Sequence, residues 1–172
     1  MKIYVKYHNQ NCLLEMHGNW VDLKSAETVS INSLKNYMIS LGVSIKLPKY
    51  FQANIVPRSS TYSKYGVIMA NHYGVVDGDT KDQKGYNGNG DIWYFNAIAL
   101  RRTKISEGDR IAQFEVRPAM SAPWWVKLKW MFTNKIEIIV VDDLGDNNRG
   151  GFGSTDPKED NGEIIDDENL IK

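Results

Sequence analysis

The sequence predicts an all-β domain of the sandwich or jelly-roll kind, and three features of the chain predict it. Short runs of residues alternate between apolar and polar types with a period of two, which is typical of strands that bury one face. Glycine, proline, Asn and Asp interrupt these runs at short intervals, as expected for many short strands. Apolar spacing of the helical kind is weak, and only the stretch after Ser59 is compatible with one or two helical turns.

The strand patterns follow one another along nearly the whole chain. Ile3, Val5 and Tyr7 share one face of the first, and Pro48 ends the second because proline cannot donate to a ladder. A further pattern runs into Pro57, and the later ones are rich in aromatic and β-branched residues. The six clearest segments are 3–7, 43–47, 51–55, 92–100, 111–116 and 136–141.

Composition limits the classes of function. The 172 residues are enough for one domain, and 21 basic residues balance 21 acidic ones, so no broad field attracts nucleic acid or membrane. Cys12 is the only cysteine, and the three histidines show no metal-ligand spacing. The chain opens on alternating residues rather than a secretion signal, and no apolar run approaches a membrane span. We therefore expect a cytoplasmic protein.

Two clusters near the middle of the chain carry residues suited to phosphate chemistry. Pro57-Arg58-Ser59-Ser60 closes a strand with a cation and two hydroxyls, which can bind phosphate oxygens, although such a turn alone is common. Asn71 to Asp77 delivers a carboxylate at the end of an apolar strand, followed by Tyr86-Asn87-Gly88. Asp77 is either a turn residue or a general base that deprotonates water.

Two more clusters lie toward the C-terminus. Gly108 to Gln113 places a turn before a strand that carries an amide side chain. Arg149 to Thr155 surrounds one aromatic residue with glycines and a cation, which is the composition of a linker or of a lid over a phosphate chain.

In order and spacing, these clusters resemble the five motifs of the trimeric dUTPase family. The residues that match the five motifs are Gly18–Ala26, Pro57–Ser60, Asn71–Asp77 with Tyr86–Gly88, Gly108–Gln113 and Arg149–Thr155. Arg58 to Tyr62 and Ile98 to Arg101 look closest to a branch from Gram-positive bacteria and their phages. The resemblance spans residues 1–156, which we take as the dUTPase domain.

The resemblance implies a jelly-roll-like dUTPase fold in a homotrimer with exchange of the C-terminal arm. It also implies hydrolysis of dUTP to dUMP and pyrophosphate with Mg²⁺, in which Asp77 activates the water that attacks the α-phosphorus. Asp22 would contact the metal through water. The implied phosphate ligands are Arg58, Ser59, Ser60, Gln113, Arg149, Ser154 and Thr155. The implied uracil and deoxyribose contacts are Asn71, Gly74, Val76, Tyr86 and Phe152. Tyr73 is an alternative to Tyr86, and Trp93 or Tyr94 to Phe152 as the residue that caps uracil.

Three segments depart from the family pattern. An insertion at 79–85 separates Asp77 from Tyr86, and residues 122–132 form a tryptophan-rich insertion. With Pro123 at a helix start, Trp124, Leu128 and Met131 would form one apolar stripe. We expect this segment to pack against a neighbouring subunit, with docking of a protein partner as the alternative. The acidic tail 157–172 is expected to be disordered, and it could compete with substrate for the arginines.

Two other functions remain open at this stage. A regulatory protein that uses the same fold to bind a partner would depend on the inserted segments. A dCTP deaminase needs a catalytic Glu on the strand after the third motif, but the segment 92–100 contains no carboxylate. The sequence therefore favours dUTP hydrolysis over both.

Overall fold

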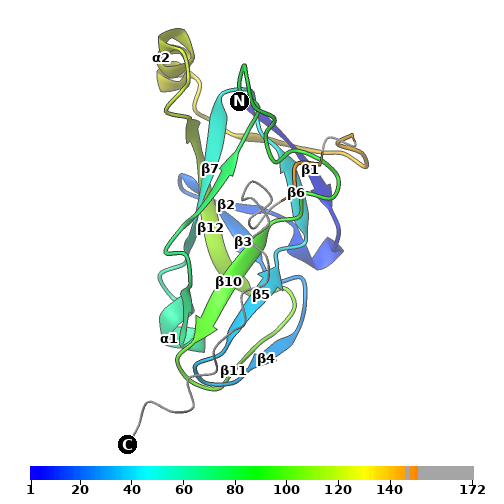
Figure 1. The fold of residues 1–172 in the computed structure, drawn as a ribbon, viewed down its shortest axis with the longest axis vertical. Helices are drawn as coiled ribbons and strands as arrows, with labels where there is room; N and C mark the ends of the chain where they lie inside the picture. The colour runs from blue at the N-terminus through cyan, green and yellow to red at the C-terminus, as the bar shows by residue number, and fades with distance from the viewer. Residues whose placement is uncertain (146–147, 151–172) are drawn as a thin grey trace, which may run out of the picture.

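The computed structural model describes residues 1–145 and 148–150, and strands are the main regular structure of these residues (Figure 1). The prediction of an all-β fold is confirmed. In chain order the elements are β1 (Lys2–Tyr7), the 3-10 helix η1 (Gln10–Cys12), β2 (Glu15–His17), β3 (Trp20–Lys24), β4 (Val29–Ile31), β5 (Asn36–Ser40), β6 (Val43–Lys46), β7 (Phe51–Pro57), α1 (Thr61–Tyr65), β8 (Val67–Met69), β9 (Gly74–Asp77), β10 (Tyr94–Ala99), β11 (Thr103–Ile105), β12 (Arg110–Pro118), α2 (Trp124–Phe132) and β13 (Glu137–Val140).

The strands form four sheets, and the largest is the one that positions the site. Its order is β2-β3-β12-β7-β9, with every neighbouring pair antiparallel. The other sheets are β13-β1-β6, β5-β10-β8 and the pair β11-β4. Among the described strands, the only parallel pairing joins β1 to β13, which are far apart in sequence. Strand β12, the longest, therefore lies between β3, which carries Asp22, and β7, which leads into Arg58, while the predicted base contacts Gly74 and Val76 lie on the edge strand β9.

The alternation in the sequence explains which side chains form the core. In β1, Ile3 and Val5 are buried while Lys2 and Tyr4 are exposed, as a strand with one solvated face requires. The same pattern holds in β7 and β12. Phe114 of β12 meets the ring of Trp93 edge-to-face, with centroids 5.1 Å apart. This aromatic contact joins the large sheet to the segment that leads into β10.

Trp93 is 1% exposed, and this burial removes one of the alternatives for capping uracil. A side chain packed on Phe114 in the core cannot reach a bound base without opening the core. The alternative that Trp93 forms the lid is therefore wrong. Tyr94, the next residue, is half-buried, and its role as a cap stays a prediction.

The two helices lie at opposite ends of the long axis of the molecule (Figure 1). Helix α1 supplies the predicted turns after Ser59, and Gly66 ends it in the left-handed conformation, with φ 65°. Helix α2 begins directly after Pro123, as predicted, and none of its residues is buried. No helix among the described residues has the length and apolarity needed to cross a membrane.

Candidate functional site

A network of charges surrounds Asp22, which is 1% exposed. Arg58 Nε lies 2.9 Å from one carboxylate oxygen of Asp22, and Arg110 Nη1 lies 3.3 Å from the other. His17 Nδ1 is 3.2 Å from that second oxygen. A buried carboxylate is tolerated when it is paired and hydrogen-bonded, so these contacts account for its burial. They also fix where the Arg58 side chain points.

Strand pairing brings these residues together from distant parts of the sequence. Gln113 of β12 is opposite Asp22 of β3 on one side and Val56 of β7 on the other. Arg58 follows β7 directly, and the hydroxyl of Thr61 donates to the carbonyl of Ile111 at 2.7 Å. That bond ties the start of α1 to β12. The predicted phosphate ligands Arg58, Ser59, Ser60 and Gln113 are thus held near one another.

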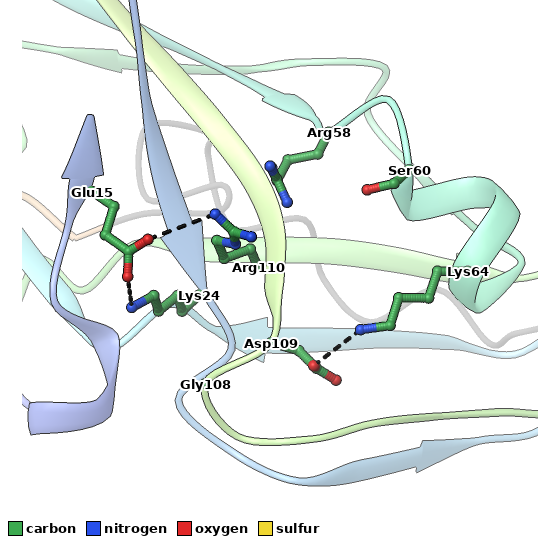
Figure 2. A pocket seen from close by; sticks show the side chains of 8 residues that line it. All are labelled: Glu15, Lys24, Arg58, Ser60, Lys64, Gly108, Asp109 and Arg110. Atoms are coloured by element: carbon green, nitrogen blue, oxygen red, sulfur yellow. Dashed lines mark hydrogen bonds and ion pairs between the residues drawn. The ribbon is translucent and has the colours of Figure 1, made fainter. Parts of the chain in front are cut away.

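An open, polar pocket of about 550 Å³ lies beside these residues. Figure 2 shows four cationic side chains and two acidic ones around it, drawn from β2, β3, α1, β12 and the turn after β7. Its lining residues are Glu15, Lys24, Arg58, Ser60, Lys64, Gly108, Asp109 and Arg110. Each of the four cations contacts a carboxylate: Lys24 is 2.6 Å from Glu15, Lys64 is 3.3 Å from Asp109, and Arg58 and Arg110 contact Asp22. The excess of positive groups suits an anion with several phosphates.

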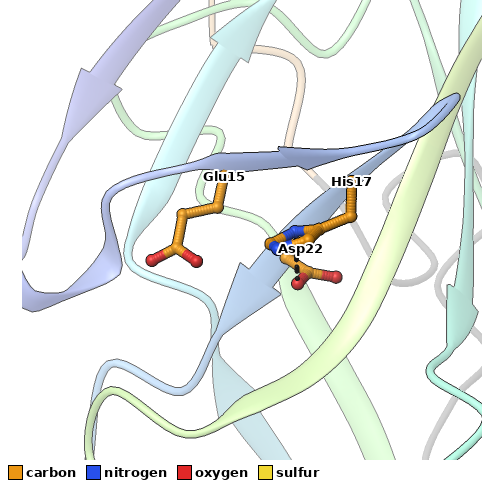
Figure 3. A group of neighbouring side chains, drawn as sticks. All are labelled: Glu15, His17 and Asp22. Atoms are coloured by element: carbon orange, nitrogen blue, oxygen red, sulfur yellow. Dashed lines mark ion pairs between the residues drawn. The ribbon is translucent and has the colours of Figure 1, made fainter.

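Glu15, His17 and Asp22 also approach one another, with one potential ligand atom from each within 4.8 Å of the others (Figure 3). The spacing of the histidines gave no sign of this group, because Glu15 and Asp22 meet across the β2–β3 pairing. Arg58, Arg110 and Lys24 already pair with the two carboxylates. The group is therefore a charge network that holds arginines, rather than a vacant cage of ligands.

Asp77 lies at the end of β9, opposite Gln52 of β7, with its side chain 48% exposed. Arg149 Nη1 is 3.8 Å from its carboxylate. The insertion that separates Asp77 from Tyr86 in sequence does not separate them in space, because the Tyr86 amide donates to the Asp77 carbonyl at 2.8 Å. Where the insertion leaves the hairpin, Gly85 lies directly against Gly78, and a Cβ on Gly85 would overlap the carbonyl carbon of Gly78. The glycines let the insertion leave the hairpin without disturbing it.

Tyr86 is half-buried, and its phenol donates to the carbonyl of Ile92 at 3.0 Å. Burial raises the pKa of this phenol to about 12, and the charge of Asp91 adds to the effect. The hydroxyl is therefore neutral and the ring fixed, as a packing surface for a sugar requires. Tyr73, the alternative, is 50% exposed beside exposed Asn71. Neither the role of Tyr86 nor that of Asn71, Gly74 and Val76 is tested by this geometry, and all stay predictions.

The two groups of residues lie at opposite ends of β7. Asp77 pairs with Gln52, and Arg58 lies six residues further along that strand. At about 3.3 Å per residue, the two backbones are roughly 20 Å apart. A single chain therefore presents two half-sites. The phosphate half-site contains Asp22, Arg58, Ser59, Ser60 and Gln113, and the aspartate half-site contains Asn71, Gly74, Val76, Asp77, Tyr86 and Arg149.

Several predicted residues lie outside the described part of the chain. These are Phe152, Ser154, Thr155 and the acidic tail 157–172. Other residues were not predicted but belong to the half-sites: Arg110, Lys24, Lys64 and Glu15 at the first, and Asp91 at the second. Arg110 and Lys24 stand inside the quoted clusters Gly108–Gln113 and Gly18–Ala26, so their motifs were visible in the sequence. The positions of the others depend on strand pairing and loop closure.

Comparison with known proteins places this geometry in a family. Residues 21–154 match the family model described as dUTPase. The chain is 41% identical over 161 residues to a SPbeta prophage-derived deoxyuridine 5'-triphosphate nucleotidohydrolase of Bacillus subtilis, covering 92% of this chain and 100% of that protein.

Two solved structures share the fold. The dUTPase of Streptococcus mutans superposes with a TM-score of 0.58 at 23% identity, covering 68% of this chain and 93% of the other. A point mutant of the dUTPase from phage phi11 of S. aureus, described with a coordinated structural Mg(II) ion, gives 0.57 at 18%, covering 70% and 93%.

The Asp22 network predicts a difference between two acidic residues. Asp22→Asn should lower the free energy of unfolding by about 2–4 kcal/mol, because it leaves two guanidinium groups without their buried partner. Glu15→Gln removes an exposed carboxylate and should leave the unfolding midpoint unchanged. Urea unfolding at one fixed protein concentration measures both. Equal midpoints for the two variants would contradict the role of Asp22 as the centre of the network.

Proposed function

Because the chain belongs to the dUTPase family, we propose that it hydrolyses dUTP to dUMP and pyrophosphate. The observation that carries the proposal is the exposed carboxylate of Asp77, held at the end of β9 with Arg149 3.8 Å away. A general base needs an accessible oxygen beside the place where the anionic substrate is bound. Asp77 meets the first condition directly, and Arg149 supplies positive charge for the second.

The reaction requires one proton transfer and one displacement at phosphorus. Asp77 accepts a proton from water as the water oxygen attacks the α-phosphorus. The bond from that phosphorus to the oxygen that bridges to the β-phosphate breaks, and pyrophosphate leaves with the electron pair. The products are dUMP, pyrophosphate and the proton held by Asp77. Alignment and charge stabilisation supply most of the rate in phosphorus chemistry of this kind.

The phosphate half-site would supply that alignment. Arg58 is held by Asp22 through Nε, and no described residue bonds its two terminal nitrogens. Such a side chain can present a fork of donors to phosphate oxygens. Ser59, Ser60 and Gln113 would add neutral donors, and Ser154 and Thr155 of the arm would close over the chain of phosphates. Ser59 and Ser60 are exposed at the start of α1, which suits this role.

Magnesium would be held mainly by oxygens of the nucleotide, which it would neutralise and align. The protein would offer it an acidic oxygen through water, as expected for an ion that dehydrates reluctantly. Asp22 fits this role poorly alone, since its buried oxygens bind Arg58, Arg110 and His17. Glu15, directly opposite on β2 and with a side chain 46% exposed, is more accessible, although Lys24 lies 2.6 Å from it. We therefore propose that water molecules would join the metal to these two carboxylates while their ion pairs with Lys24 and the arginines stay in place.

The hairpin that carries Asp77 would select uracil. Exposed Asn71 and the backbone from Gly74 onward can pair with the edge of the base, and Tyr86 can pack against deoxyribose. A cytosine amino group would then face donors without an acceptor, which is costly in a dry pocket. Phe152 or Tyr94 would cover the base.

The distance between the half-sites supports an assembly of several chains. Arg58 of one chain must face Asp77 of another if both act on one nucleotide. Contact between two different surfaces is head-to-tail, and it closes into a ring when the rotation permits. A homotrimer is the ring that the family resemblance implies. In such a ring each site draws on at least two subunits.

The exposed face of α2 favours a second function, the docking of another protein. Trp124 is 71% exposed and Phe132 is 80% exposed, and the predicted stripe residues Leu128 and Met131 also face solvent. So large an apolar surface in one segment is typical of a contact site. The contact is made either with a neighbouring subunit or with a protein partner, and residues 122–132 are the segment involved.

A dCTP deaminase is not supported. Strand β10 carries no carboxylate, and Asp91, three residues before it, is buried with its oxygens bonded to backbone amides. A group held in this way cannot move protons at a bound cytosine.

The central prediction concerns Asp77. In a panel of deoxynucleoside triphosphates with Mg²⁺, the wild type should release pyrophosphate selectively from dUTP. Asp77→Asn should reduce kcat about 10²–10⁴-fold, because the amide cannot accept the proton. EDTA should abolish wild-type turnover. Asp79→Asn, in the insertion, is the matched control and should retain activity. Undiminished turnover by Asp77→Asn would refute the assignment.

Shared sites predict complementation between two inactive variants. Arg58→Ala and Asp77→Asn chains, mixed after mild dissociation and reassociation, should regain activity, because some sites then combine an intact Arg58 with an intact Asp77. The measurement is dUTP turnover of the mixture against each variant alone. A mixture no more active than its components, although subunit exchange is shown by mass, would mean that each chain carries its own complete site.

Deletion of α2 distinguishes packing between subunits from docking of a protein partner. Replacing residues 122–132 with a short Gly-Ser linker should dissociate the assembly if α2 packs between subunits, as measured by light scattering after gel filtration. An intact assembly with unchanged turnover would instead assign the apolar face to a protein partner. Trp124→Ser with Leu128→Ser is the milder variant and should follow the deletion.

A further inference from the structure

Asp91 is a second buried carboxylate, 1% exposed, at the end of the hairpin that follows Asp77. It accepts a hydrogen bond from the Gly88 amide at 2.9 Å within the hairpin. It accepts further hydrogen bonds from residues far away in sequence. The Arg149 amide lies 3.1 Å from both oxygens, and the Gly150 amide lies 3.2 Å from one of them. Asp91 thus joins the Asp77 hairpin to the start of the C-terminal arm.

Burial makes these bonds strong determinants of structure. A carboxylate removed from water is destabilising unless hydrogen bonds or opposite charges replace its hydration. Two of the three amides that solvate Asp91 belong to residues 148–150, hereafter the arm root. Without the arm root, the buried carboxylate would keep only the Gly88 amide. Docking of the arm root is therefore favoured wherever Asp91 stays ionised and buried.

The next bond along the chain supports the same docking. The Gly90 amide donates to the Asn148 side chain at 2.7 Å. Gly90 directly precedes Asp91, and Asn148 directly precedes Arg149. These bonds hold the backbone of Arg149 and leave its guanidinium group available. That group extends to within 3.8 Å of the Asp77 carboxylate. The position of the Arg149 charge therefore follows from the anchoring of its backbone.

We propose that Asp91 is a positioning residue for the reaction, which anchors the arm root and so sets the Arg149 guanidinium beside Asp77. This inference rests on the proposed function for its kinetic consequence, but not for its structural one. Asp91 acts through Arg149 and touches neither substrate nor the reacting atoms. Its carboxylate is required as such, because an Asn in either orientation would turn its NH2 group toward the Arg149 amide and toward the Gly88 or the Gly150 amide, with donors facing donors.

A double-mutant cycle with Arg149 tests the proposal. Asp91→Asn should lower kcat/KM for dUTP on the order of tenfold or more, mainly through a higher KM, since a bond to a charged acceptor is lost. Arg149→Ala should lower it at least as much. The double variant should match Arg149→Ala within about twofold, because residues that act through one another are not additive. Effects that multiply would overturn the proposal, as would an Asp91→Asn variant with wild-type kinetics.

Asn89→Ala is the matched control. Its side chain bonds Asp143 and the Leu144 amide, so the variant loosens the chain before the arm root and leaves the Asp91 contacts in place. It should keep a wild-type KM. If Asp91→Asn melts near the assay temperature, Asp91→Glu replaces it in the same cycle, because the longer side chain keeps the charge and displaces the oxygens.

Hydrogen exchange measured on the full chain distinguishes this inference from the proposed function. The Arg149 and Gly150 amides should exchange slowly in the wild type and much faster in Asp91→Asn, whatever the substrate. Rapid exchange of both amides in the wild type would refute the anchor. Wild-type protein that leaves dUTP intact, yet shows this protection, would refute only the hydrolase.

Discussion

Strand β7 sets the constraint from which the functional organisation follows. It pairs with β9 where Asp77 ends that strand, and it carries Arg58 just beyond its other end. A strand is stiff and extended, so the roughly 20 Å between these groups cannot be closed by a change of rotamer. A nucleotide that needs both, as we propose, would lie between chains. The proposed assembly would then follow from one strand of the fold, and the exposed face of α2 is one of the surfaces that it would cover.

Much of the fold was predictable, because alternation of residues reports directly on which strands have one buried face. The strands at Ile3–Tyr7 and 111–116 were predicted for this reason, and each contributes side chains to the core. Strands of three residues, such as β4 and β8, are too short to show a pattern. Order and spacing of the motifs indicated the family. Pairing of strands, by contrast, depends on distant segments, so the distance between Asp77 and Arg58 could not be predicted from the sequence.

The site residues also divide into those that local sequence patterns predict and those that depend on distant contacts. Arg58, Gln113 and Asp77 stand in recognisable clusters, but their partners do not. Asp91 is one acidic residue between glycines and an aromatic segment, which resembles a turn, and its bonds to Arg149 span 58 residues. The alternative that Trp93 caps uracil failed for a related reason. Its aromatic character suited a lid, yet strand alternation decides whether such a ring faces solvent or core, and here it packs on Phe114.

The two buried carboxylates show two ways of placing an arginine. Asp22 binds the Arg58 side chain itself at Nε, so the charge is fixed in position and the terminal nitrogens stay directed outward. Asp91 binds the Arg149 backbone, so the chain is fixed and the guanidinium is placed beside Asp77 without being bonded by Asp91 itself. The first arrangement suits a rigid floor that receives the phosphates. The second suits an arm that must change its contacts when substrate arrives, since Arg149 can leave Asp77 for a phosphate while its backbone stays in place.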